Sequence, residues 1–119
     1  MTVPVKWLTS QLAIAGQIQP QDLPAISEMG FKTVICNRPD FENGPGQPTA
    51  EEIRQAAKAK GISFAFHPVP GNGGTASDAL EMAKLMNELP KPILSYCYSG
   101  GRCMALIGLA ARMGESIPQ

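Results

Sequence analysis

Short apolar runs alternate along the chain with longer segments in which apolar residues recur at helical spacing. The short runs predict strands, because they span about four to eight residues and several are rich in β-branched side chains. Such an alternation is typical of successive strand–helix units, which build a mainly parallel sheet. We therefore expect strands at Leu12–Ala15, Lys32–Cys36, Ile62–Val69 and Ile93–Tyr96.

A helical segment follows each of these strands. Thr49 and Glu52 form a capping box, which predicts a helix from that point through Lys60. Gly30 and Gly61 stand where helices of this kind end. The expected helices are Gln21–Met29, the segment from Thr49 through Lys60, Asp78–Leu89 with Thr75 or Ser77 as its cap, and Arg102–Met113.

This order of elements predicts the fold class and the domain organisation. A chain of 119 residues can bury one sizeable core, and it is too short for two domains. We expect a single α/β domain over residues 1–119, with three layers and a mainly parallel sheet of four or five strands flanked by helices. The chain ends soon after its last predicted helix, so truncation of the domain at its C-terminus stays open.

Composition narrows the classes of partner. Lys and Arg are scattered, and the formal net charge is +0, so the basic surface of a nucleic-acid-binding protein is not expected. No apolar run reaches the roughly 20 residues that span a bilayer, and the first residues lack the pattern of a signal peptide. We expect a cytoplasmic protein without nucleic-acid or membrane partners, and its oligomeric state stays open.

The segment between the last predicted strand and the last helix carries the candidate chemistry. Backbone amides of a glycine-rich turn and of a helix N-terminus converge on an anion. The helix dipole and a neighbouring arginine also favour the thiolate of a cysteine. We predict Cys97 as a catalytic nucleophile and Arg102 as a clamp for a small anionic substrate. The anion-binding loop between them consists of Tyr98, Ser99, Gly100 and Gly101.

A plain structural interpretation of this loop also exists, because most cysteines at strand ends are buried thiols without chemistry. The three cysteines, Cys36, Cys97 and Cys103, match neither a metal knuckle nor a disulfide framework. We expect Cys103 to pack within the last helix, behind the loop. Cys36 ends a neighbouring strand, and its approach to Cys97 from behind would allow reversible oxidation, which is a minor hypothesis.

Other side chains are expected near the carboxyl ends of the strands, where sites assemble in parallel sheets. Asp40 is a candidate catalytic residue, and a capping role in its loop is the equally strong alternative. Arg38 is expected to bind the substrate anion or to form a structural ion pair. His67, the only histidine, is expected in the core or behind the loop, so neither a Cys–His dyad nor a metal site is predicted. No cofactor is predicted.

Three segments resemble a known family. They are Gly30–Asp40 with its Asn-Arg-Pro-Asp run, Gly46–Pro48, and the loop Tyr96–Arg102. They are similar to the phosphatase-like domain of beta-lactamase hydrolase-like proteins, a family that resembles dual-specificity protein tyrosine phosphatases in fold. The resemblance implies a protein tyrosine phosphatase-like sheet flanked by helices, with Cys97 as nucleophile and Arg102 as anion clamp.

Several features depart from the phosphatase pattern. Four residues separate Cys97 from Arg102, where tyrosine phosphatases have five, and four is the spacing of rhodanese-type sulfurtransferases. Tyr96 stands in place of the usual histidine, and Cys103 in place of the hydroxyl after the arginine. The turn at residues 71–74 lacks the usual proton-donating aspartate. A general acid would then come from another carboxyl group, and the candidates are Asp40, Glu42 and Asp78.

Three functions therefore remain. The leading hypothesis is hydrolysis of phosphate monoesters through a phosphocysteine intermediate, which rests mainly on the family resemblance. The alternative is rhodanese-like sulfur transfer, in which Cys97 forms a persulfide with a sulfane sulfur donor, and the loop length favours it. The third is a domain that binds phosphate or carries sulfur without turnover, because the family resemblance includes fusions to metallo-hydrolase domains.

Overall fold

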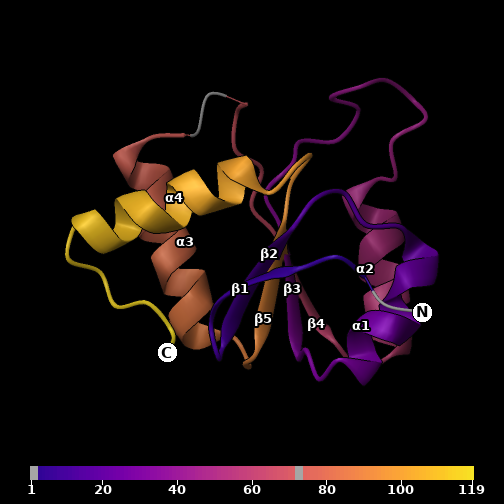
Figure 1. The fold of residues 1–119 in the computed structure, drawn as a ribbon. Coiled ribbons are helices and arrows are strands. Elements are labelled where there is room, and N and C mark those ends of the chain that lie inside the picture. The colour runs from indigo at the N-terminus through magenta and orange to yellow at the C-terminus, as the bar shows by residue number, and fades with distance from the viewer. Residues whose placement is uncertain (1–2, 72–73) are drawn as a thin grey trace.

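The computed structural model describes residues 3–71 and 74–119, which form a five-stranded sheet with helices on both faces (Figure 1). The strand order is β1-β2-β5-β3-β4. Strands β2, β5, β3 and β4 run parallel, whereas β1 pairs antiparallel with β2. The strands are β1 (Lys6–Thr9), β2 (Leu12–Ala15), β3 (Thr33–Cys36), β4 (Ser63–Phe66) and β5 (Ile93–Tyr96). The helices are the 3₁₀ turn η1 (Pro20–Asp22), α1 (Leu23–Glu28), α2 (Ala50–Ala59), α3 (Ala76–Glu88) and α4 (Gly101–Arg112).

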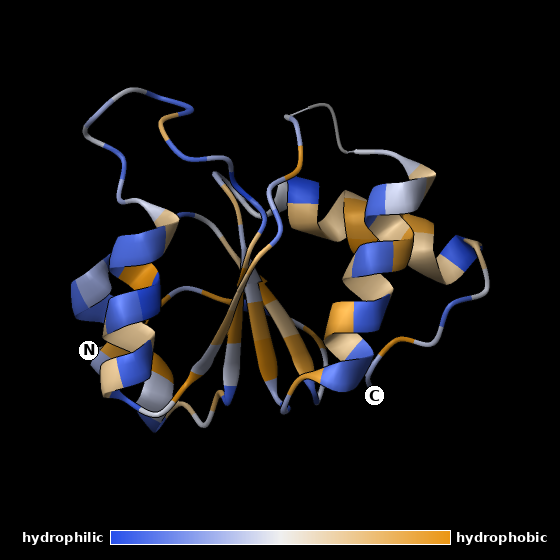
Figure 2. Ribbon diagram, turned by 180° about the vertical axis from the view of Figure 1, so that it is seen from behind, coloured by the Kyte–Doolittle hydropathy of each residue, from blue (hydrophilic) through white to orange (hydrophobic). Residues whose placement is uncertain are grey.

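The molecule has three layers, as the sequence predicted. Helices α1 and α2 cover one face of the sheet, and α3 and α4 cover the other (Figure 1). Hydrophobic colour gathers on the strands and on helix faces between the layers (Figure 2). Two apolar cores therefore stabilise the domain, one on each side of the sheet. None of the helices in the described part of the chain is long and apolar enough to cross a membrane.

Strand β1 was not among the expected strands. It forms a hairpin with β2, with Lys6 opposite Ile14 and Trp7 opposite Ala13. The Trp7 ring stacks on Phe31, with centroids 4.9 Å apart. A partly exposed edge strand of four residues has little apolar periodicity of its own, so tertiary pairing decides its structure.

Several predicted boundaries move for local reasons. The first predicted helix begins as the 3₁₀ turn η1 at Pro20, and α1 follows it only from Leu23. Strand β4 ends at Phe66 instead of Val69, although the amides of His67 and Val69 still donate to the carbonyl oxygens of Cys36 and Asn37. The predicted turn at residues 70–74 includes residues 72 and 73, which lie outside the described residues.

Helices α2 and α3 begin with the same device. The Thr49 hydroxyl accepts a hydrogen bond from the Glu52 amide, and the Glu52 carboxylate accepts one from the Thr49 amide. Thr75 and Asp78 repeat this arrangement at the start of α3, so Thr75 is the cap of that helix. Each capping box satisfies backbone donors of the first turn within one short stretch of sequence.

Candidate functional site

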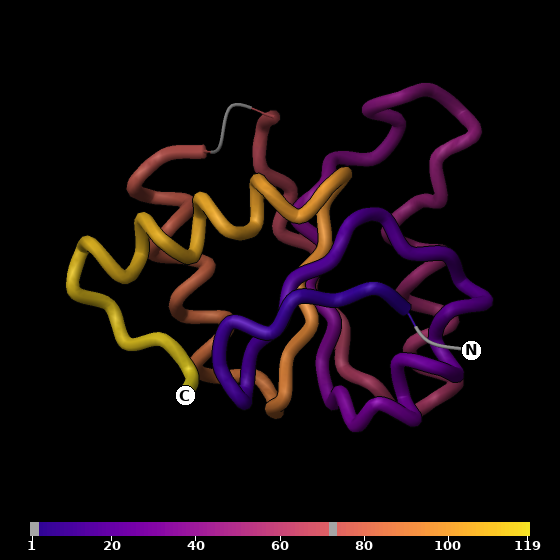
Figure 3. The backbone as a smooth tube through the Cα atoms, in the orientation of Figure 1, coloured from indigo at the N-terminus to yellow at the C-terminus, as the bar shows by residue number. Residues whose placement is uncertain are grey.

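The sheet register brings the carboxyl ends of four strands into one row. Ala15, Tyr96, Cys36 and Phe66, the last residues of β2, β5, β3 and β4, lie side by side. The residues that follow them are Gly16, Cys97, Asn37 and His67. Hydrogen bonds between the strands continue through Cys97, Asn37 and His67, whose amides donate to the neighbouring strand ends. The loops that follow these strand ends lie together at the same end of the sheet (Figure 3).

Two glycines allow the loop that begins at Cys97 to pass close to β2. Gly100 has a φ of 91°, and an added Cβ there would lie 3.6 Å from the backbone of Ala15. At Gly16 an added Cβ would lie 2.9 Å from the carbonyl oxygen of Tyr98. At Gly16 a side chain would therefore force a shift of the backbone, and at Gly100 the positive φ disfavours any residue with a Cβ. The tight path directs the Gly100 amide at Cys97 Sγ, at 3.1 Å.

Cys97 is the residue whose acidity the loop changes most. Its thiol is buried, with 1% of the residue exposed. A hydrogen bond from the Cys103 thiol and the amides of Cys103, Gly100 and Ser99 lower the pKa of Cys97 to about 5, although burial opposes this change. At neutral pH the group is therefore a thiolate, the form in which cysteine is a nucleophile.

Cys103 packs in the core beneath α3 and α4, as predicted, and its thiol also lies against Cys97, at the base of the loop. Because α4 starts at Gly101, Cys103 is the third helical residue and turns toward the loop. Its Sγ also lies 3.5 Å from Asn37 Oδ1, a second acceptor for the one hydrogen of this thiol. The pKa of Cys103 is raised, first by the hydrogen bond to Cys97 and then by burial.

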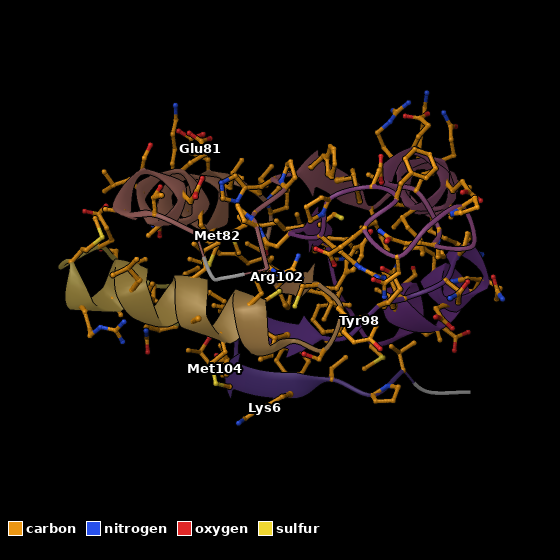
Figure 4. The ribbon with its side chains drawn as sticks, turned by 90° about the horizontal axis from the view of Figure 1, so that it is seen from above. Lys6, Glu81, Met82, Tyr98, Arg102 and Met104 are labelled. Atoms are coloured by element: carbon orange, nitrogen blue, oxygen red, sulfur yellow. The ribbon has the colours of Figure 1, made fainter. Side chains whose placement is uncertain are left out.

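Arg102 lies over the same strand ends, with 9% of its side chain exposed. Seen from above, it lies between Met82 of α3 and Tyr98 of the loop (Figure 4). Its Nη1 donates to the carbonyl oxygen of Val69 at 3.2 Å, and its Nη2 pairs with the Glu42 carboxylate at 3.1 Å. Its Nε is buried and has no hydrogen-bond partner among the described residues. One donor of the guanidinium thus remains available to an anion.

Arg38 and Arg102 share one carboxylate. Arg38 Nε lies 3.0 Å from Glu42 Oε1, and the Arg38 guanidinium carbon lies 4.9 Å from the ring centroid of Tyr98. Hydrogen bonds with Arg102 and then Arg38 lower the pKa of Glu42. Because Arg38 is only 3% exposed and fully engaged, its contacts are those of a structural ion pair. Tyr98 is 60% exposed and covers this pair from the solvent side.

The three carboxyl groups considered as proton donors each have another partner. Asp40 Oδ1 accepts a hydrogen bond of 2.7 Å from the amide of Ala50, the first residue of α2. Asp78 closes the capping box of α3. Glu42 is ionised at neutral pH because the two arginines lower its pKa. The geometry therefore presents no carboxylic acid ready to donate a proton from these three positions.

His67 and two residues that sequence reasoning missed lie beneath the loop. His67 is 9% exposed, its Nδ1 lies 3.1 Å from Asn37 Nδ2, and burial lowers its pKa. Ser95 Oγ donates to Asn37 Oδ1 at 2.6 Å. Polar residues within or directly after buried strands were the signal for Asn37 and Ser95. No cluster of metal-binding side chains is present in residues 3–71 and 74–119.

Cys36 lies on the opposite side of the sheet from Cys97. It packs in the core beneath α1 and α2, whereas Cys97 packs in the core beneath α3 and α4. Successive residues of a strand point to opposite faces, so Cys36 shares its face with Tyr96, the residue before Cys97. The structure therefore does not bring Cys36 and Cys97 together, against the hypothesis of an oxidised pair. Burial raises the pKa of both Cys36 and Tyr96.

Comparison with solved structures relates this geometry to phosphatases. A putative phosphatase from Neisseria meningitidis Z2491 superposes with a TM-score of 0.83 at 33% identity, over 95% of this chain and 79% of that one. Kinase associated phosphatase, in a form whose catalytic-site cysteine is replaced by serine, has a TM-score of 0.65 at 17% identity, over 93% of this chain and 76% of that one. Because the identity is low in the second case, that similarity shows only the shared protein tyrosine phosphatase-like fold.

Sequence comparison agrees with this fold. The beta-lactamase hydrolase-like protein of Agrobacterium fabrum (strain C58) is 37% identical over 110 residues, which are 92% of this chain and 25% of that protein. The chain thus spans about a quarter of the length of the curated relatives it matches. The model of one family, the phosphatase-like domain of beta-lactamase hydrolase-like proteins, matches residues 4–113. Because this match covers nearly the whole chain, the chain belongs to that family.

Proposed function

We propose that this chain is a cysteine-dependent phosphatase that hydrolyses phosphate monoesters through a phosphocysteine on Cys97. The family and the phosphatases among its structural neighbours support a phosphatase-type function and a small anionic phosphate substrate. The single observation that carries the proposed mechanism is the thiolate of Cys97 facing backbone amides of the loop, with Arg102 over the same strand ends. That combination supplies a nucleophile and donors for an oxyanion at one point.

The first proposed step is attack of the Cys97 thiolate on phosphorus. A sulfur–phosphorus bond forms, the bond from phosphorus to the ester oxygen breaks, and that oxygen leaves with its electron pair. Loop amides and the free Nε of Arg102 would hold the non-bridging oxygens as negative charge shifts. Water then attacks phosphorus, the sulfur–phosphorus bond breaks, and inorganic phosphate departs while Cys97 returns to a thiolate.

The proposal also concerns which leaving groups the site accepts. Asp40, Glu42 and Asp78 are engaged with a helix terminus or with arginines, so a strong proton donor is lacking at those positions. A substrate whose leaving oxygen is stable as an anion needs no such donor. We therefore infer a preference for aryl phosphates over simple alkyl phosphates.

The test is phosphate release from an aryl phosphate and from an alkyl phosphate between about pH 5 and 8. Cys97→Ser should lower turnover by roughly 10³-fold or more, because the phosphocysteine can no longer form. Cys36→Ser is the matched control, since it changes a buried cysteine on the other face of the sheet. Aryl phosphate turnover that survives in Cys97→Ser would refute the proposed mechanism.

Sulfur transfer remains the second candidate, and the observation that favours it is the loop of four residues between Cys97 and Arg102. In that reaction Cys97 takes the outer sulfur of thiosulfate, sulfite leaves, and cyanide removes the sulfur as thiocyanate. The same variants are assayed with thiosulfate and cyanide in parallel. Thiocyanate formation that depends on Cys97, without phosphate release, would replace the phosphatase proposal.

A further inference from the structure

Asn37 uses each of its polar groups to join elements of the site. The residue has no exposed surface. Its backbone N–H donates to the carbonyl oxygen of Tyr96 at 2.8 Å. Its own carbonyl oxygen accepts from the Val69 amide at 3.1 Å and from Arg102 Nη1 at 3.5 Å. One buried side chain and its backbone thus connect β3 and β5 with the loop after β4 and with the start of α4.

The orientation of the Asn37 amide is determined by a backbone carbonyl. Asn37 Nδ2 lies 3.0 Å from the carbonyl oxygen of His67, which can only accept a hydrogen bond. The NH₂ group must therefore face His67, and Oδ1 must face Ser95 and Cys103. His67 Nδ1 also faces this NH₂ group at 3.1 Å, which assigns the ring proton of neutral His67 to Nε2.

Oδ1 of Asn37 then affects how a proton is shared between two thiols. Cys97 and Cys103 are in contact, and both are buried. Ser95 Oγ donates its hydrogen to Oδ1 at 2.6 Å. The one hydrogen of a Cys103 thiol has two acceptors within reach, Cys97 and Oδ1, whereas a thiolate at Cys103 would face the lone pairs of Oδ1 at 3.5 Å. Cys97 instead faces N–H donors, with the Gly100 amide at 3.1 Å.

We propose that Asn37 is a positioning residue that keeps a proton on Cys103 and thereby leaves the negative charge on Cys97. The inference rests on the proposed function only in taking Cys97 as the nucleophile. An ordinary hydroxyl in place of Cys103 would need no such control, since it does not ionise near neutral pH. A second thiol at this position can compete for the charge, and the orientation of Asn37 decides the competition.

Other ionisable groups around the pair are few. Cys97 and Cys36 of β3 raise the pKa of Cys103, and Ser95 of β5, which lies beside it, lowers that pKa. His67 faces the Nδ2 side of Asn37. The charges of Asp78 and Glu81 of α3 act to raise the pKa of His67, against the effect of burial. Arg102 contacts the carbonyl oxygen of Asn37. Only Asn37 touches both Cys103 and the carbonyl group of His67 among these contacts.

The test is an ionisation profile that requires no turnover. Thiolate absorbance and iodoacetamide labelling, mapped by mass spectrometry, are followed with pH in the native protein. We expect Cys97 to be labelled with a midpoint of about 5 and Cys103 to stay protected. Asn37→Leu keeps a branched side chain but removes the acceptor whose lone pairs oppose a thiolate at Cys103. Part of the charge should then pass to Cys103, so that Cys103 becomes labelled and the labelling of Cys97 falls by about 2-fold or more.

Control variants separate this effect from a general disturbance. Cys103→Ser cannot ionise in this range, so Asn37→Leu in that background should lower Cys97 labelling by much less than in the parent. His67→Ala removes the ring beside Nδ2 but keeps Oδ1 in place, and it should leave Cys103 protected. Protection of Cys103 in Asn37→Leu, or an equal loss of Cys97 labelling in the Cys103→Ser background, would overturn the proposal.

A second measurement applies if Asn37→Leu does not fold. Cys103→Ala removes the protonated partner without touching Asn37, and it should raise the Cys97 midpoint, whereas Cys103→Ser should restore the parent value. Equal midpoints for the alanine and serine variants would show that the Cys103 proton has no influence, and the proposal would fail. Because no substrate enters these measurements, their outcome is independent of whether phosphate esters are turned over.

Discussion

The N-termini of α2 and α3 differ from that of α4 in how their backbone donors are satisfied. Thr49 with Glu52 and Thr75 with Asp78 close capping boxes at the first two helices. Helix α4 has no side-chain cap, and its first turn follows Gly100 in a left-handed conformation. Its Cys103 amide points instead at the sulfur of Cys97, together with amides of the loop.

The difference shows what separates a structural helix start from a functional one. A capping side chain satisfies the N–H groups of the first turn permanently and adds stability. At α4 a thiolate takes that place, so the same donors stabilise negative charge on a reactive atom. Four changes test this comparison, and they are ordered by the size of the expected effect.

The largest expected effect is on the ionisation of Cys97. The pKa is about 5 in the folded protein and 9.0 without the fold, so the thiolate fraction at pH 6 should differ by roughly 10³-fold. Below pH 5 the native thiol becomes protonated and labelling should fall. The measurement is the pH dependence of iodoacetamide labelling in native and in urea-unfolded protein. A native midpoint close to that of the unfolded chain would contradict the proposed role of the α4 N-terminus.

Replacing Gly100 should have the next largest effect. Gly100→Ala forces an alanine into a φ of 91° within the loop, so the loop amides should lose their alignment with Cys97. We expect roughly 10- to 100-fold lower aryl phosphate turnover. Gly114→Ala is the control, because its φ is 86° but nothing lies within 4 Å. Both variants should lose about 1 kcal/mol of stability, and only the first should lose activity.

Removing a capping box should affect stability alone. Thr75→Ala deletes the hydroxyl that accepts from the Asp78 amide, at a cost of about 1 kcal/mol. Thermal unfolding should shift down by roughly 4 °C. Ser77→Ala, at an exposed position two residues further along in the same first turn, is the control and should leave the midpoint unchanged. A large loss of turnover in Thr75→Ala would show that the N-terminus of α3 also takes part in the site.

The smallest expected effect concerns Glu42. Its carboxylate neutralises Arg102 and is ionised at neutral pH, because the neighbouring arginines lower its pKa. Glu42→Gln should therefore tighten binding of inorganic phosphate by about 2- to 5-fold, measured as inhibition of turnover. Glu51→Gln removes a similar ion pair on α2 and should leave phosphate binding unchanged. Weaker phosphate binding in Glu42→Gln would show that the main role of the carboxylate is to orient Arg102, and not to compete with phosphate for it.

How well the sequence predicts a contact depends on how far apart along the chain the two interacting residues lie. The capping box at Thr49 was predicted, since its partner lies three residues away. The loop from Cys97 to Arg102 was found for the same reason. Asn37 was missed because its contacts with Ser95 and Cys103 join residues 58 and 66 positions apart. Nothing near Asn37 in the sequence indicates that those residues meet there.

The sequence by itself determined the alternation of strands and helices, the three-layer class, and the cysteine and arginine that border the candidate loop. Periodicity, caps and turn residues act over a few positions, so a single chain displays them directly. The tertiary structure alone decided that β1 joins the sheet, that Cys103 lies against Cys97, and that Asp40 binds the N-terminus of α2. Those outcomes depend on sheet register and on which core each side chain enters, and both are set by contacts between distant segments.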